Sequence, residues 1–157
     1  MLSGVEASHW QIVTLAIIKM MTPRQVADYM FDQDYFSQWM NIKMIEVKEN
    51  YCLIEMPIKK DMINGLKTVH GGITFAFADS ALAFSSNNTG DAAVALNCII
   101  NFTKAGKEGD IFRAESVLVN DTRKTAVYDI KITNQNDDLV ANFVGTVYKI
   151  GKKVTEL

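Results

Sequence analysis

The pattern of hydrophobic and polar positions first indicates a helical segment and then a change to strands. Thr22 followed by Pro23 is a typical helix start, because threonine caps and proline fits the first helical position. Residues 24–40 are helical in propensity, with a break expected near residues 32–34. From Ile42 the hydrophobic and polar positions alternate with a period of two. The hairpin that it predicts has strands at residues 43–48 and 51–58.

A stretch rich in alanine, phenylalanine and leucine follows a connecting loop. It covers residues 73–86, and residues 87–90 end it with types that tolerate a left-handed backbone. We therefore expect one long apolar helix. After it, alternating runs bounded by turn residues return, and these predict strands. The expected strands are residues 92–102, 110–119, 125–133 and 139–150.

This order of elements indicates an α+β fold. Strands joined by short turns are antiparallel, and a nearly all-apolar helix has to be covered on most sides. An antiparallel sheet of five to six strands wrapped around one long central helix meets both demands, and that arrangement is the hotdog fold. We expect residues 23–157 to form this domain and residues 1–22 to be an N-terminal extension with a short helix. Its apolar run, residues 12–18, is shorter than the roughly 20 residues that a membrane helix needs.

Composition narrows the classes of partner. The net charge of −2 implies no basic face, so we expect no nucleic-acid partner. Cys52 and Cys98 lie in apolar runs without the spacing of a metal site. We interpret them as reduced thiols of a cytoplasmic protein that carries no metal and no cofactor. The hydrophobic share of 48% is typical of a soluble protein, and no membrane partner is expected.

Asp79 is the only charged residue between His70 and Asp91. A carboxylate among alanine, leucine and phenylalanine loses hydration, which is costly unless partners compensate. Buried acids with perturbed pKa values are candidates for chemistry. The alternative is that Asp79 caps a neighbouring backbone group or pairs with a buried lysine.

The sequence His70-Gly71-Gly72 opens the apolar helix. Glycine allows close approach to the backbone, and the first N–H groups of a helix lack partners at its positive end. Such an end can polarise a thioester carbonyl and hold the oxyanion that forms on attack. Glycines here, followed by one buried acid, favour a catalytic helix.

The spacing of Gly71 and Asp79 predicts a site shared between subunits. They are eight residues apart, which is about 12 Å along a helix. Catalytic groups act at about 3 Å, so one thioester carbon cannot touch both. Two antiparallel copies of the helix, related by a two-fold axis, would bring Gly71 of one copy near Asp79 of the other. We therefore expect at least a homodimer with two equivalent sites.

The same residues resemble the phenylacetic acid degradation thioesterases of the hotdog superfamily. Residues 101–106 and 127–130 are similar to that family too, and the resemblance covers roughly residues 42–151. The elements of the family motif are Asn64-Gly65, His70-Gly71-Gly72 and Asp79.

The resemblance implies hydrolysis of acyl-CoA thioesters, with phenylacetyl-CoA and its ring-hydroxylated forms as typical substrates, by tetramers built from hotdog dimers. Asp79 matches the family's nucleophile or general base, and Gly71 matches the backbone donor to the thioester carbonyl. His70 matches a histidine near the thioester, and Gly72 a substrate-binding glycine. Asn64 matches an amide that helps to place the water or the carboxylate. The alternatives are a helix-start role for His70 and a turn role for Asn64.

Three loop cations are candidates for binding the CoA phosphates. They are Lys104, Arg123 and Lys124. Lysine and arginine bind phosphate readily, although exposed loop cations are also common without any such role.

Aromatic residues are numerous in residues 29–39. They either pack their rings onto a sheet edge or form a lip for an apolar acyl group.

Two other functions fit a hotdog protein. A hydratase or dehydratase would need an asparagine-proline-x-histidine pattern, which is absent. A non-catalytic acyl-CoA-binding protein would not need a buried acid and would normally bring a DNA-binding segment. The sequence favours the hydrolase.

Overall fold

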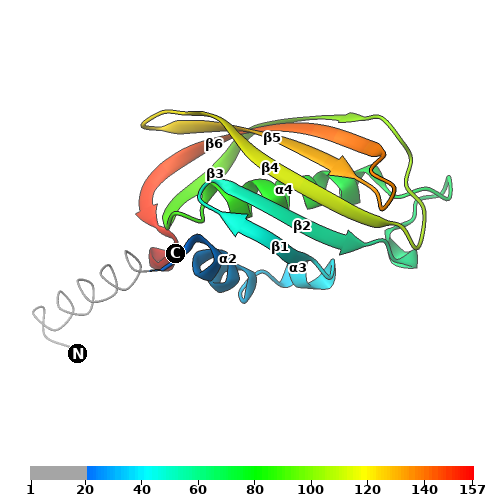
Figure 1. The fold of residues 1–157 in the computed structure, drawn as a ribbon, viewed down its shortest axis with the longest axis horizontal. Coiled ribbons are helices and arrows are strands. Elements are labelled where there is room, and N and C mark those ends of the chain that lie inside the picture. The colour runs from blue at the N-terminus through cyan, green and yellow to red at the C-terminus, as the bar shows by residue number, and fades with distance from the viewer. Residues whose placement is uncertain (1–20) are drawn as a thin grey trace, which may run out of the picture.

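The computed structural model of the chain describes residues 21–157, so most of the predicted N-terminal extension lies outside the described residues (Figure 1). Within residues 21–157 the predicted helices and strands are confirmed, and β4 and β6 continue beyond their expected ends. Two short 3-10 helices were not predicted. In chain order the elements are α2 (Pro23–Phe31), α3 (Tyr35–Trp39), β1 (Lys43–Lys48), β2 (Tyr51–Pro57), η1 (Lys60–Met62), α4 (Gly71–Ser86), β3 (Asp91–Phe102), β4 (Ile111–Asp121), β5 (Thr125–Thr133), β6 (Leu139–Lys153) and η2 (Val154–Glu156).

Local capping explains the first two helices and the break between them. Thr22 and Gln25 form a capping box, in which the Gln25 N–H donates to Thr22 Oγ1 (3.3 Å) and the Thr22 N–H donates to Gln25 Oε1 (2.8 Å). Asp34 caps α3 by accepting from the Ser37 N–H at 2.9 Å. The predicted break near residues 32–34 is confirmed.

The six strands form one antiparallel sheet in the order β1-β2-β4-β5-β6-β3. It curves around α4, which contacts every strand from β2 to β6 (Figure 1). On β4 the side chains of Phe112, Ala114 and Ser116 are buried against the helix, whereas Arg113 and Glu115 point outward. The hotdog fold is thus confirmed, with the core between the concave sheet and α4.

Helix α4 is covered on two sides. Ala81 and Leu82 are buried, and Leu82 packs so close to β6 that a Cβ at Gly145 would lie 2.6 Å from its side chain. On another side, the Ser80 and Ser37 hydroxyls are hydrogen-bonded at 3.0 Å, which joins α4 to α3. A third side stays partly exposed, and we call it the open face of α4. Its residues are Gly72, Phe75, Ala76, Asp79 and Ala83.

Strand β3 is an edge of the sheet and lies against α4. It exposes large apolar side chains along its length, with exposed fractions between 50% and 61%. An unpaired edge strand with apolar side chains is the kind of surface that proteins cover. These side chains belong to Val94, Leu96, Ile99 and Phe102.

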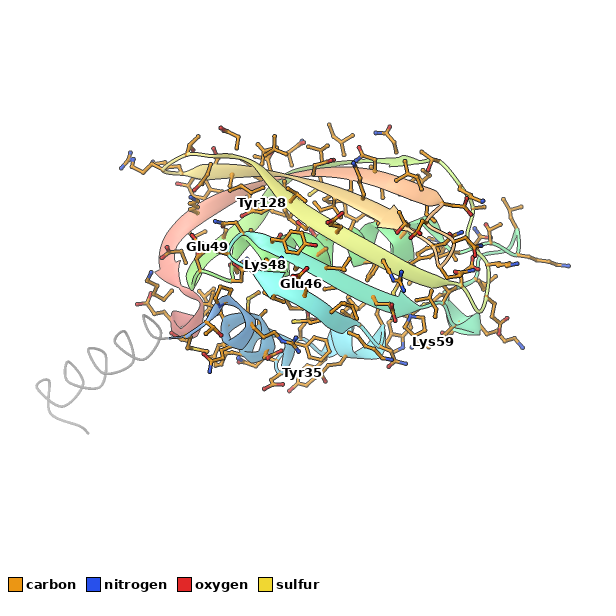
Figure 2. All side chains as sticks on the ribbon, in the orientation of Figure 1. Tyr35, Glu46, Lys48, Glu49, Lys59 and Tyr128 are labelled. Carbon is orange, nitrogen blue, oxygen red and sulfur yellow. The ribbon has the colours of Figure 1, made fainter. Side chains whose placement is uncertain are left out.

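The aromatic residues of the first helices divide into two groups. Phe31 packs against Phe84 of α4, with ring centroids 6.2 Å apart. Tyr35, Phe36 and Trp39 on α3 are exposed, and Tyr35 projects from the side of the molecule away from β4 and β5 (Figure 2). Phe31 therefore packs its ring inward, whereas the rings of α3 do not. That the α3 rings form a lip for an apolar acyl group stays a prediction.

No helix within residues 21–157 is long and apolar enough to cross a membrane.

Candidate functional site

Asp79 lies on the open face of α4, half-buried beside apolar neighbours. Its carboxylate has no hydrogen bond or ion pair with any residue in the described part of the chain, so the capping and buried-lysine alternatives find no partner there. Burial raises the pKa of Asp79 above its ordinary value, because the charged form loses hydration. An uncompensated carboxylate that faces an open surface is available for chemistry.

His70 is the N-cap of α4. Its backbone is extended (φ −61°, ψ 131°), and its Nδ1 accepts from the Gly72 N–H at 2.9 Å. The helix-start role is therefore present. Because Nδ1 is the acceptor, the neutral imidazole carries its proton on Nε2. His70 is exposed, so this N–H can donate outward.

The Gly71 N–H is the amide at this helix end that donates no hydrogen bond within residues 21–157, since Gly72 donates to His70 and Ile73 to the His70 carbonyl. Beside Gly71 lies a cavity of about 280 Å³, lined among others by Thr74, Phe102 and Lys104, which we call the Gly71 cavity. A free amide at the positive end of a helix, next to a cavity, suits a carbonyl oxygen.

Asn64 closes its own turn. Its Oδ1 accepts from the Leu66 N–H at 2.8 Å and from the Thr68 N–H at 3.2 Å. The turn role is therefore present, and it shapes the loop that leads to His70.

A single protomer does not bring the three loop cations together. Lys104 lines the Gly71 cavity, where its ammonium pairs with Asp138 at 2.6 Å, and its N–H donates to the Val140 carbonyl of β6. Arg123 and Lys124 lie in the β4–β5 turn, where the Lys124 carbonyl accepts from the Lys149 N–H of β6. Val140 and Lys149 are nine residues apart, which is about 30 Å along an extended strand.

Gly71 and Asp79 are likewise separated within one protomer. Helix α4 runs without a break from Gly71 to Ser86, so their eight-residue spacing keeps them about 12 Å apart along its axis. Within one protomer the free amide and the free carboxylate therefore lie too far apart to act on the same carbonyl carbon.

Two residues near these halves were not found from the sequence. Burial and then the charge of Asp79 raise the pKa of the Cys98 thiol on β3. The ring of Phe102 lies over Gly71, with Cζ 3.3 Å from the position of a Cβ there. Their even spacing along β3 could have suggested that both lie on one face of the strand, but not which part of α4 they meet.

Metal ligands are not gathered in the described portion of the chain: no three side chains of His, Cys, Asp or Glu lie together as an ion site within residues 21–157.

Comparison with known proteins adds to this geometry. Residues 66–141, which include Gly71 and Asp79, match the model of the thioesterase superfamily. The acyl-coenzyme A thioesterase PaaI of Escherichia coli is 36% identical over 83% of this chain and 94% of its own length. The solved structure of E. coli PaaI, from the phenylacetic acid degradation operon, superposes with a TM-score of 0.82 at 35% identity, covering 83% of this chain and 95% of that one.

Two further solved structures are similar. A point mutant of the phenylacetic acid degradation protein PaaI from Thermus thermophilus has a TM-score of 0.72 at 32% identity, over 74% of this chain and all of that one (100%). The smu.793 protein of Streptococcus mutans, solved with acetyl-CoA bound, has a TM-score of 0.70 at 31% identity, over 72% of this chain and 91% of that one. With the free amide and the free acid on one helix, these likenesses lead to one conclusion: the chain belongs to the thioesterase superfamily, in the group of the phenylacetic acid degradation thioesterases.

Proposed function

We propose that this protein hydrolyses acyl-CoA thioesters to a free acid and CoA, with Asp79 as the catalytic carboxylate. The observation that carries the proposal is the Asp79 side chain itself, half-buried on the open face of α4 without a partner in the described residues. A fold gains nothing from such a group, whereas thioester hydrolysis needs one. The family membership and the CoA-bound relative support the substrate class.

The mechanism begins with the thioester carbonyl docked on the Gly71 N–H, where the positive end of α4 stabilises the oxyanion that develops on attack. Asp79 of the facing subunit then acts in one of two ways. It attacks the carbonyl carbon and expels the CoA thiolate, which leaves an anhydride that water hydrolyses, or it takes a proton from a water that attacks. The Nε2–H of His70 and the amide of Asn64 help to place the thioester and the water.

The functional unit is a homodimer in which the open faces of two α4 helices meet about a two-fold axis. The apolar edge of β3 and the small side chains of Ala76 and Ala83 allow close approach of the two copies. The two-fold axis also orients the sheet of the partner in the opposite direction. The Gly71 end with Lys104 therefore faces the partner's opposite end, where Arg123 and Lys124 lie. The CoA phosphates are held by cations from both subunits, and Gly72 supports the substrate at the helix end.

The acyl group is phenylacetyl or a ring-hydroxylated derivative, and two dimers associate into a tetramer. The support for this substrate is the likeness to E. coli PaaI from the phenylacetic acid degradation operon. The free thiols of Cys52 and Cys98 fit a reducing cytoplasm.

The test is thiol release from a panel of aryl, short-chain and long-chain acyl-CoAs. We expect hydrolysis by the wild type and a fall in kcat of roughly 10²–10⁴-fold for Asp79→Asn, the size of a lost general base. Asp32→Asn makes the same chemical change at an exposed position and should leave kcat unchanged. Near-equal rates for Asp79→Asn and the wild type would reject the catalytic assignment. Acyl-CoA binding without hydrolysis by the wild type would favour the non-catalytic binding protein instead.

A single turnover in oxygen-18 water tests direct attack by Asp79. Label found in the Asp79 carboxylate shows an anhydride that water opens at the Asp79 carbonyl carbon. Label confined to the product acid fits attack by water on the thioester, or an anhydride that water opens at the acyl carbon.

A further inference from the structure

The Phe102 ring packs against Gly71, at the place where the side chain of another residue would begin. A Cβ at position 71 would lie 3.3 Å from Cζ of the Phe102 ring, closer than most such contacts in proteins, and 3.6 Å from Cε1, an ordinary van der Waals distance. The backbone of Gly71 is not in the left-handed region, so glycine is not required there for its conformation. A side chain here would instead press on the Phe102 ring, which would have to give way by a few tenths of an ångström.

The backbone that carries this ring is held in place by hydrogen bonds to β6. Phe102 ends β3, and the next two residues are pinned to β6. The N–H groups of Thr103 and Lys104 both donate to the Val140 carbonyl, at 2.9 Å and 3.2 Å, and the Thr103 hydroxyl donates to the Leu139 carbonyl at 2.6 Å. The backbone at the end of β3 therefore cannot move away from Gly71 without breaking these bonds.

Phe102 is nevertheless 56% exposed, and its ring forms part of the wall of the Gly71 cavity. The charged neighbour on the same wall, Lys104, is turned to Asp138. The surface beside the free Gly71 amide is therefore a flat apolar ring rather than a cation.

We propose that Phe102 is a specificity-determining residue, which selects acyl groups that are unbranched next to the thioester carbonyl. This inference rests on the proposed function, because it assumes that the carbonyl docks on the Gly71 N–H. A carbonyl oxygen in that place puts the carbon next to the carbonyl within reach of the ring. A CH₂ at that carbon packs on the flat ring, whereas an added methyl group meets it. The ring also excludes water from the amide, which strengthens the hydrogen bond to the carbonyl.

Two substrates that differ by one methyl group test the selection. They are phenylacetyl-CoA and 2-phenylpropanoyl-CoA, and the measured quantity is the ratio of their kcat/KM values. We expect Phe102→Ala to raise the ratio of branched to unbranched activity at least about tenfold, the usual effect of one carbon in an apolar pocket. Phe102→Leu should give an intermediate ratio. Val119→Ala, which trims an exposed side chain on β4, should leave the ratio at the wild-type value.

A uniform loss of activity toward both substrates in Phe102→Ala, with an unchanged ratio, would overturn the proposal. It would mean that the Phe102 ring supports the fold without discriminating between acyl groups. Failure of the proposed function has a different signature, because Asp79→Asn then hydrolyses phenylacetyl-CoA as fast as the wild type, whatever happens at Phe102.

The contact between the two residues has its own test, which does not depend on turnover. Gly71→Ala should lower the midpoint of thermal unfolding in the wild-type background, where the new methyl group meets the ring. The same change should lower it far less in the Phe102→Ala background. Equal losses in both backgrounds would show that the ring does not occupy the space at Gly71, and the selection mechanism would fall with it.

Discussion

At the scale of single residues, the energetic anomaly of Asp79 is the strongest functional signal. The chain places a carboxylate between apolar turns of α4, and no residue of the described chain compensates for its lost hydration. It was visible in the sequence because charge and hydrophobicity are local properties. Gly71 and His70 were visible for the same reason, since a helix start is also encoded locally. Phe102 and Cys98 were not, because their roles come from how β3 packs on α4.

The raised pKa of Asp79 predicts how stability depends on pH. A carboxyl whose pKa is higher in the folded than in the unfolded protein favours folding below its unfolded pKa. That contribution is lost as the pH rises through the folded value. Asp79→Asn removes this dependence, so we expect it to raise the unfolding midpoint at neutral pH and to have little effect under acid conditions where Asp79 is protonated. Thermal unfolding of both proteins from acid to neutral pH measures the difference. A loss of stability at neutral pH would mean that Asp79 is compensated after all.

Two substitutions at Gly71 test the role of its backbone N–H. Proline is tolerated at the first position of a helix, and the extended backbone of His70 suits a following proline. Gly71→Pro therefore removes the N–H while α4 keeps its start. Gly71→Ala is the matched control, because it adds a Cβ and keeps the N–H. We expect kcat to fall by roughly 10²–10³-fold more for proline than for alanine, the size of one lost oxyanion donor. Similar kcat values for the two variants would exclude the amide from the mechanism.

Among the secondary-structure elements, capping residues in the sequence predicted the ends of the first helices. The Thr22-Pro23 start and the break before α3 follow from hydrogen bonds between residues three apart in the sequence. The docking of α3 on α4 could not be foreseen, because Ser37 and Ser80 are 43 residues apart. The 3-10 helices were missed because each is a single turn set by the loop around it.

The contribution of the Ser37–Ser80 hydrogen bond, which joins α3 to α4, to the unfolding free energy can be measured directly. The Ser37 hydroxyl donates to Asp34 Oδ2 at 2.5 Å, so the proton between the two serines belongs to Ser80. Ser37→Ala leaves that buried donor without its acceptor, and we expect a loss of about 1–3 kcal/mol in unfolding free energy. Adding Ser80→Ala should recover part of the loss, because no buried donor then remains. Denaturant unfolding of the single and double variants gives the coupling, and strictly additive losses would argue against the hydrogen bond.

At the scale of the whole molecule, the fold class followed from the order of elements, but the order of strands did not. Antiparallel hairpins gave the β1-β2 and β4-β5-β6 neighbours. The pairing of β2 with β4 and of β3 with β6 is non-local, and it leaves β3 at the edge. That edge strand packs against α4, and we propose that a second copy of the chain covers both.

We propose that Gly71 of one subunit and Asp79 of the other form each site, and mixing two inactive variants is the decisive experiment. Asp79→Asn and Gly71→Pro protomers are co-expressed and assayed for thiol release from phenylacetyl-CoA. In a mixed dimer, one site combines an intact Gly71 with an intact Asp79, while the other site carries both lesions. Random pairing should therefore restore about a quarter of wild-type activity from two nearly inactive proteins. If the mixture stays as inactive as its parents although mixed dimers form, the shared site is contradicted.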